Sequence, residues 1–246
     1  MIAALGREVA GLTRRLEGSR SARDGACRTY VGSVLGVPVK LAVTGMGADR
    51  ASRGARALLS ATPLRALLSL GFAGALDGDL AAGALSLPER LLLDGDPSAA
   101  TSPDATLRAR LVSAARQAGL EPRGGSCVTA ESMVTDPGAR AALGAAHGAA
   151  LVDMEGYWLA REAAAAGVPF ASARAVSDAL SDHHPVLAGA LRGGGMSVTR
   201  LLRGYAARPR EATKLPGLMR NARAAAGTLE RFALAALRSL ALETVP

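Results

Sequence analysis

Short apolar runs alternate along this chain with longer segments in which apolar residues recur every three or four positions. Apolar runs with the length of buried strands lie at 37–44, 67–70, 84–93, 150–154 and 170–176. Helical spacing is found at 51–60, 107–118 and 156–166. Strands that alternate with helices in this way predict an α/β domain with a largely parallel sheet.

Glycine-rich and polar turns follow two of the predicted strands. The turn 71–74 (GFAG) is expected after the strand at 67–70, and Ser177 with Asp178 is expected after the strand at 170–176. Ligands bind at the carboxyl ends of strands in open α/β sheets. Both segments are therefore candidates for a binding site.

The chain from residue 196 onward has a helical pattern that is interrupted at 206–216. We therefore expect an α/β domain at 1–195 and a C-terminal helical extension at 196–246, packed on the same domain. The last helix has an apolar face formed by Leu229, Phe232, Ala233, Ala236, Leu237 and Leu240. This face predicts a helix that covers the domain or a dimer seam, and contact with a membrane surface or an apolar substrate is the alternative.

The composition limits the class of partner. A length of 246 residues suits one large domain, and 49% hydrophobic residues with only 3% aromatic residues indicate a core of small aliphatic side chains. The net charge of +8 would suit an anionic partner. The arginines are scattered, however, and no basic block is interleaved with aromatic residues, so we predict no nucleic-acid partner.

Cysteine usage and the N-terminal residues indicate a cytoplasmic setting. Cys27 and Cys127 are far apart and form no CxxC motif, which favours reduced thiols. Arg7 and Glu8 interrupt the apolar start of the chain, so no signal peptide is predicted. The apolar window 66–76 is too short to span a bilayer, which leaves peripheral attachment to the membrane as the only membrane contact we expect.

Motifs for cofactors and metals are weak. The segment 45–47 (GMG) lacks the third glycine of a dinucleotide fingerprint, and no GxxxxGK[ST] motif occurs, so we predict no cofactor. The segment 183–185 (HHP) has only His147 and Asp182 as further candidate ligands, and we predict a surface loop there instead of a metal site. The absence of GxSxG argues against serine-hydrolase chemistry.

Three acidic residues suggest a site built from separate segments. Glu155 begins a predicted helix, where a carboxylate interacts favourably with exposed amides, and Asp178 could similarly cap the chain after its strand. Each has an ordinary structural explanation when taken alone. Together with Glu8 near the amino terminus and Arg174 on the strand before Asp178, they indicate one shared site.

The segment 151–178, LVDMEGYWLAREAAAAGVPFASARAVSD, resembles the signature of the nucleoside phosphorylase and nucleosidase family that includes methylthioadenosine/S-adenosylhomocysteine nucleosidases. The segments AALGREV and SLGFAGALDGDLAAGALSLPE are similar to two further family segments. This resemblance implies a single-domain, three-layer α/β/α fold with a mixed, mostly parallel twisted sheet. It also implies a small-molecule nucleoside as partner and a homo-oligomer.

A narrower resemblance lies in the segments 140–170 and 200–232. Both resemble the hopanoid-associated branch of this family, whose proposed task is to remove adenine from adenosylhopane and leave ribosylhopane. The branch implies a nucleoside with a large apolar 5′ group.

The resemblance also implies roles for the acidic residues. Asp178 would protonate or hydrogen-bond N7 of the base as the general acid, and Glu8 would orient the attacking water as the general base. Glu155 would hold the ribose hydroxyls, and Met154 would pack against the sugar. The other substrate-binding residues that we expect are Phe72, Ala73, Gly74, Ser177 and Arg174.

The nucleophile is predicted from two positions of the glycine-rich turn. Phosphorylases of this family place an Arg and a Ser there to bind phosphate, whereas this chain has Ser69 and Phe72. We therefore expect water, although Arg50 or Arg53 could supply a substitute cation. Phosphorolysis and a catalytically silent nucleoside-binding module are the alternatives.

Overall fold

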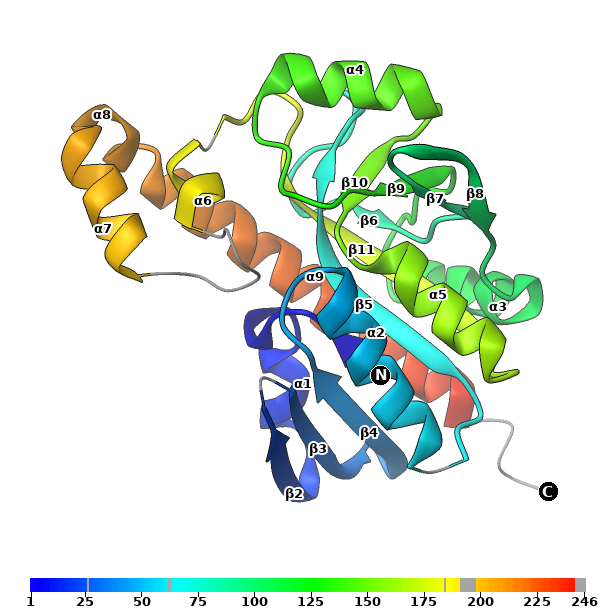
Figure 1. The fold of residues 1–246 in the computed structure, drawn as a ribbon. Coiled ribbons are helices and arrows are strands. Elements are labelled where there is room, and N and C mark those ends of the chain that lie inside the picture. The colour runs from blue at the N-terminus through cyan, green and yellow to red at the C-terminus, as the bar shows by residue number, and fades with distance from the viewer. Residues whose placement is uncertain (26, 62, 184, 191–197, 242–246) are drawn as a thin grey trace.

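A computed structural model describes residues 1–25, 27–61, 63–183, 185–190 and 198–241. One large mixed sheet lies between helices that cover both of its faces (Figure 1). The expected three-layer α/β/α architecture is confirmed. The predicted boundary between 195 and 196 and the middle residue of the 183–185 segment lie outside the described residues.

In the described residues the sheet has 11 strands. They are β1 (Ile2–Ala3), β2 (Glu17–Asp24), β3 (Cys27–Val34), β4 (Val37–Val43), β5 (Leu67–Ala75), β6 (Leu85–Ser86), β7 (Arg90–Leu93), β8 (Asp96–Thr101), β9 (Ser126–Thr129), β10 (Leu151–Asp153) and β11 (Phe170–Asp178). The order is β2-β3-β4-β1-β5-β10-β9-β7-β8, and β11 pairs with β5 and β6. Strands β4, β1, β5 and β11 are parallel to one another. Strands β10, β9 and β7 form a second parallel group that runs antiparallel to β5, and antiparallel hairpins occupy the two ends of the sheet.

The helices of the described residues include one short 3-10 turn, η1 (Gly6–Glu8). The α-helices are α1 (Ala10–Arg14), α2 (Ala48–Ser60), α3 (Ala105–Gln117), α4 (Pro137–His147), α5 (Gly156–Ala165), α6 (Pro185–Ala190), α7 (Val198–Ala207), α8 (Pro209–Ala212) and α9 (Leu215–Ala241). Side-chain caps start two of them, because Asp104 accepts a hydrogen bond from the Leu107 amide and Asp136 accepts one from the Ala139 amide. No helix in the described part of the chain is long and apolar enough to cross a membrane.

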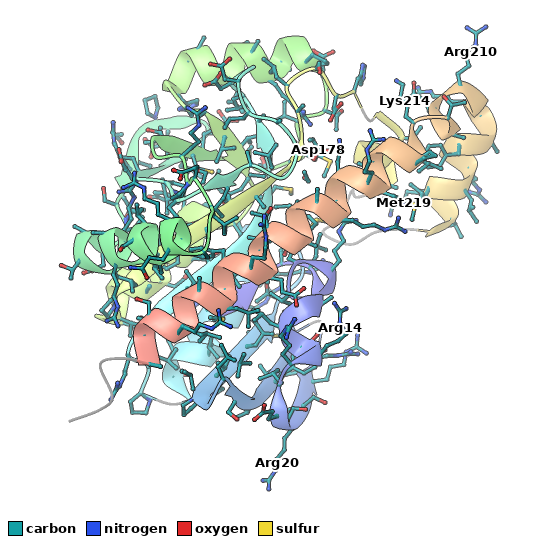
Figure 2. All side chains as sticks on the ribbon, turned by 180° about the vertical axis from the view of Figure 1, so that it is seen from behind. Arg14, Arg20, Asp178, Arg210, Lys214 and Met219 are labelled. Atoms are coloured by element: carbon teal, nitrogen blue, oxygen red, sulfur yellow. The ribbon has the colours of Figure 1, made fainter. Side chains whose placement is uncertain are left out.

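Two apolar cores fill the spaces between the layers. Leu68 and Leu70 of β5 point to the face that α3 and α9 cover, and Leu67 points to the face that α2 and α5 cover. This division follows from the alternation of side chains along a strand. Figure 2 shows α9 crossing the back of the molecule over the sheet.

The apolar face predicted for the last helix is buried within the fold. Leu229, Phe232, Ala233 and Ala236 of α9 are fully buried, and α9 packs mainly against β11 and α3. This face is therefore not on the surface.

Some strand boundaries differ from the prediction. β5 continues through the glycine-rich turn to Ala75, and β11 extends to Asp178, so neither site segment follows its strand as a separate turn. The run at 84–93 divides into β6 and β7, with Pro88 between them. Proline has no amide hydrogen to donate to a sheet, which explains the interruption.

A buried ion pair joins the central strands. The Nε and Nη2 atoms of Arg174 on β11 each lie 2.8 Å from Oδ2 of Asp153 on β10. Arg174 also donates from Nη1 to the hydroxyl of Ser69 on β5, over 3.0 Å. Asp153 accepts a further hydrogen bond from the Thr129 hydroxyl at 2.6 Å. Both charged side chains are almost completely buried, so each depends on the other for compensation of its charge.

Two glycines make room for this pair. Gly71 is the β5 partner of Arg174, and a Cβ atom there would lie 3.3 Å from Nη1 of Arg174. At Gly156, a Cβ atom would lie 2.5 Å from Oδ2 of Asp153. The Gly156 amide instead donates to that oxygen over 3.0 Å. Glycine at both positions therefore permits the close approach of the backbone.

We expect Arg174→Met to lower the free energy of unfolding by about 3–5 kcal/mol, because it leaves the Asp153 carboxylate buried without its cation. Urea denaturation of the purified variant measures this change. The matched control is Arg15→Met, which breaks the exposed Arg15–Glu230 pair and should cost less than about 1 kcal/mol. Equal losses in the two variants would contradict a special role for the buried pair.

Candidate active site

A cleft opens at the carboxyl ends of β5, β10 and β11. Its empty space is about 770 Å³, a volume that includes solvent at the open mouth. Glu8, Glu155 and Asp178 all line this cleft. The three acidic residues predicted from separate segments therefore lie in one cavity.

Glu8 is held by two backbone amides. Its Oε2 accepts a hydrogen bond from the Leu5 amide at 2.7 Å, and its Oε1 accepts one from the Phe72 amide at 3.0 Å. The carboxyl group thus connects the amino-terminal turn to β5. Burial raises the pKa of Glu8 above its ordinary value, and the two amides partly oppose that shift.

Glu155 lies between β10 and α5. Its Oε1 accepts a hydrogen bond from the Gly47 amide at 2.7 Å. Gly47 has a φ of 94°, a conformation that favours glycine. Burial, followed by the negative charge of Asp153, raises the pKa of Glu155 from 4.5 to about 8. The ionised form of Glu155 is therefore disfavoured at neutral pH.

Asp178 is the last residue of β11, and an irregularity of the strand places it in the cleft. The register between β11 and β5 shifts between Val176 and Asp178. Consecutive side chains of a regular strand point to opposite faces, whereas Ser177 and Asp178 both line the cleft. The Ser177 hydroxyl donates to Oδ2 of Asp178 over 2.6 Å. Ser177 therefore helps to orient this carboxyl group.

Of the other predicted residues, Met154, Phe72, Ala73 and Gly74 also line the cleft. Arg174 is not among the lining residues, because its guanidinium lies within the sheet layer and binds Asp153 and Ser69. We interpret Arg174 as a residue that holds the strands of the site together and does not contact the substrate. Ser69 is buried with it, as the acceptor of the Arg174 hydrogen bond.

The prediction from sequence missed Arg140 on α4. This side chain is 2% exposed and lines the cleft. Its Nε donates to the Val134 carbonyl over 2.8 Å, and its Nη1 donates to the Ala179 carbonyl over 2.7 Å. Arg140 thereby fixes the residue that follows Asp178 to the neighbouring loop. A single arginine in an alanine-rich helix has no local pattern that could have identified it.

The apolar end of the cleft was also missed. Met46 is buried there, and the partly buried residues packed around it are Ala4, Leu5, Met133, Leu201 and Leu218. These six residues come from five separate segments, so no periodicity connects them in the sequence. Helix α9 forms part of the cleft wall through Leu218 and Ala222, and Leu201 of α7 packs against Met46.

The arrangement combines acid–base groups with an electrostatic environment for a cation. Carboxyl groups in different surroundings can divide the work of a general acid and a charge-stabilising anion. Asp178 has a hydroxyl partner, whereas Glu8 and Glu155 have amide partners. A reaction with a developing positive charge fits such a site.

Several solved structures are similar to this fold. The methylthioadenosine/S-adenosylhomocysteine nucleosidase of Neisseria meningitidis is 19% identical, with a TM-score of 0.78 and 97% of each chain covered. The corresponding nucleosidase of Colwellia psychrerythraea is 20% identical, with a TM-score of 0.75, and covers 97% of this chain and 93% of its own. Futalosine hydrolase of Helicobacter pylori is 18% identical, with a TM-score of 0.72 and coverages of 94% and 95%. At these identities the likeness shows the fold.

Comparison with curated protein sequences gives no significant match. A family model described as Phosphorylase superfamily, however, matches residues 1–192, a region that contains Glu8, Glu155 and Asp178. The match extends over more than half of the chain and includes the central strands of the sheet. The chain therefore belongs to the phosphorylase superfamily.

Proposed function

We propose that this protein is a purine nucleosidase that hydrolyses the N-glycosidic bond of a 5′-substituted adenosine. The observation that carries this proposal is the shared cleft of Glu8, Glu155 and Asp178. Similar folds include a nucleosidase solved with methylthio-immucillin-A and another solved with adenine, which supports the same class of substrate.

Asp178 is the proposed general acid. Cleavage leaves a cation-like sugar and an electron-rich base, so protonation at N7 of the base assists its departure. The hydrogen bond from Ser177 keeps the Asp178 carboxyl group in one orientation. Arg140 holds the carbonyl of the next residue and so restrains the end of the strand.

Glu155 and Glu8 are proposed to act on the sugar side of the bond. The Glu155 carboxylate would hold the ribose hydroxyls and face the positive charge that develops on the ring. Glu8 would accept a proton from the attacking water, whose oxygen forms the new bond to C1′ as the C1′–N9 bond breaks. The products are adenine and a free sugar with its 5′ group.

Water is the proposed nucleophile. Ser69, in place of the arginine of phosphorylases, is buried and bonded to Arg174. Phe72 offers an aromatic ring in place of a hydroxyl group. Charge-assisted hydrogen bonds are worth about 1.5–3 kcal/mol each, so the loss of a guanidinium and a hydroxyl weakens any phosphate site.

The apolar end of the cleft supports a large apolar 5′ group. Met46, Met133 and Leu218 would contact such a group through carbon and sulfur atoms. Together with the resemblance of 140–170 and 200–232 to the hopanoid-associated branch, this favours adenosylhopane as substrate and ribosylhopane as product of hopanoid biosynthesis. Cysteine usage supports a cytoplasmic setting, the wider family resemblance supports a homo-oligomer, and the helical pattern from residue 196 supports 196–246 as an extension of the 1–195 domain.

Purified protein should release adenine from 5′-alkylthioadenosines at the same rate, within about twofold, with and without phosphate. Asp178→Asn should lower this rate about 10²–10⁴-fold, because the general acid is lost. Chromatography of the base and sugar products measures both effects, and the matched control is Asp79→Asn in an exposed turn. A sugar 1-phosphate as product would contradict the choice of water, and turnover unaffected by Asp178→Asn would contradict the mechanism.

The value of kcat/KM should rise about tenfold per pH unit below pH 8 and level off above it. The free protein has a Glu155 pKa of about 8, and the proposed role requires the carboxylate. Because Glu8 also needs its carboxylate and has a raised pKa, Glu155→Gln should lower kcat/KM and remove only the part of the rise that is centred near pH 8. Initial rates at low substrate concentration between pH 6 and 9.5 measure it.

Unfolding of the same variant tests the direction of the Glu155 pKa shift independently of activity. Because folding raises the Glu155 pKa from 4.5, the stability that this group contributes is complete below about pH 4.5 and is lost as the pH rises through about 8. The free energy of unfolding of Glu155→Gln minus that of the parent should therefore be larger at pH 9 than at pH 5. An unchanged difference at the two pH values would contradict the raised pKa.

Leu218→Ser should lower kcat/KM for 5′-octylthioadenosine about 10–100-fold more than for adenosine. This range corresponds to the loss of about 1.5–3 kcal/mol for a buried leucine side chain. Met219→Ser is the control, because Met219 is 52% exposed and does not line the cleft. Equal losses on both nucleosides would show that Leu218 does not contact the 5′ group.

A further inference from the structure

The segment 198–223, which we call the basic arm, comprises α7, α8 and the first turns of α9. With α6, it lies beyond the edge of the sheet at one end of the molecule (Figure 1). The sequence of this arm has seven basic residues and one acidic residue. Its charge is therefore far more one-sided than that of the whole chain.

Most of these cations face solvent. Arg203, Arg208, Arg210, Arg220 and Arg223 are exposed, and none forms an ion pair within the part of the chain that the structure describes. The acidic residue Glu211 binds Lys214 over 3.0 Å. The arm thus presents five exposed arginines, and its single acidic residue, Glu211, is paired with Lys214.

The arm also exposes large apolar side chains. Leu202 on α7 is 64% exposed and Met219 on α9 is 52% exposed. Their neighbours Leu201 and Leu218 turn inward to the apolar end of the cleft. Each helix therefore divides its apolar residues between the cleft and the surface.

We propose that the basic arm binds the surface of a membrane that contains anionic lipids. Clusters of four to eight Lys and Arg residues attract anionic headgroups, and exposed leucine and methionine side chains can enter the acyl boundary. A second copy of this chain is a poorer occupant, because two arms of the same charge would repel each other. Single-stranded nucleic acid is also poorer, because the one aromatic residue of the arm, Tyr205, is partly buried.

This surface has a consequence for the substrate. Leu218 lines the cleft and the adjacent Met219 faces outward, so a lipid surface against the arm would lie next to the apolar end of the cleft. An apolar 5′ group could then pass from the lipid into the cleft without crossing water. This consequence rests on the proposed function, whereas binding of the arm to lipid does not.

Sedimentation with vesicles tests the binding surface directly. Vesicles of 30% phosphatidylglycerol in phosphatidylcholine should bind the full-length protein, and vesicles of phosphatidylcholine alone should bind it at least about tenfold more weakly. The triple variant Arg203→Glu, Arg210→Glu, Arg220→Glu should lose at least about a hundredfold in binding to the anionic vesicles. The double variant Leu202→Ser, Met219→Ser should lose about tenfold.

The matched control reverses the same number of charges elsewhere. Arg14, Arg20 and Arg23 are exposed, and Figure 2 shows Arg14 and Arg20 away from the arm. Their triple replacement by Glu should change vesicle binding less than about threefold. Thermal unfolding of all variants checks that they fold, independently of any nucleosidase activity.

Three results would overturn the proposal. One is an equal loss of vesicle binding in the arm variant and the control variant, which would indicate a response to net charge alone. Another is binding to an oligonucleotide without binding to anionic vesicles. The third is dissociation of an oligomer by the arm variant, seen by light scattering, with vesicle binding unchanged.

Discussion

The buried pair of Arg174 and Asp153 is the interaction on which the rest of the structure depends. It joins β11 to β10, and through Ser69 it reaches β5, so the three strands that end at the cleft share one charged contact. A charge in this interior is tolerated only with a well-placed partner. The pair thereby restricts how β11 and β10 can lie relative to each other. Asp178 is the last residue of β11 and Glu155 follows the end of β10, so the distance between them depends on this arrangement.

The ionised forms of the Glu8 and Glu155 carboxyl groups are disfavoured by burial. Burial raises the pKa of both Glu8 and Glu155, and the amides of Phe72 and Gly47 compensate only part of the cost. Groups with such perturbed pKa values in a cleft are typical of functional sites. A cationic sugar in the cleft would remove part of the disadvantage. Burial of these two carboxyl groups therefore costs stability whenever they are ionised.

The C-terminal helices connect this chemistry to the surface. α9 covers one face of the sheet with a buried apolar face, and its first turns then border the cleft. One continuous helix therefore contributes to the core, the site and the basic arm.

The sequence by itself determined the elements and the family resemblance. Periodicity predicted the positions of β4, β5, β10 and β11 and of α2, α3 and α5, but it did not identify β2, β3, β8, β9 or α4. The segment 151–178 indicated Glu155 and Asp178, because both follow local strand signals. Only the tertiary structure decided the support role of Arg174, the contribution of Arg140 and the apolar end around Met46. The physical reason is that periodicity describes which face a side chain takes within its own element. Which distant side chains meet depends on the register of strands, on the irregularity between Val176 and Asp178, and on how helices pack across the sheet.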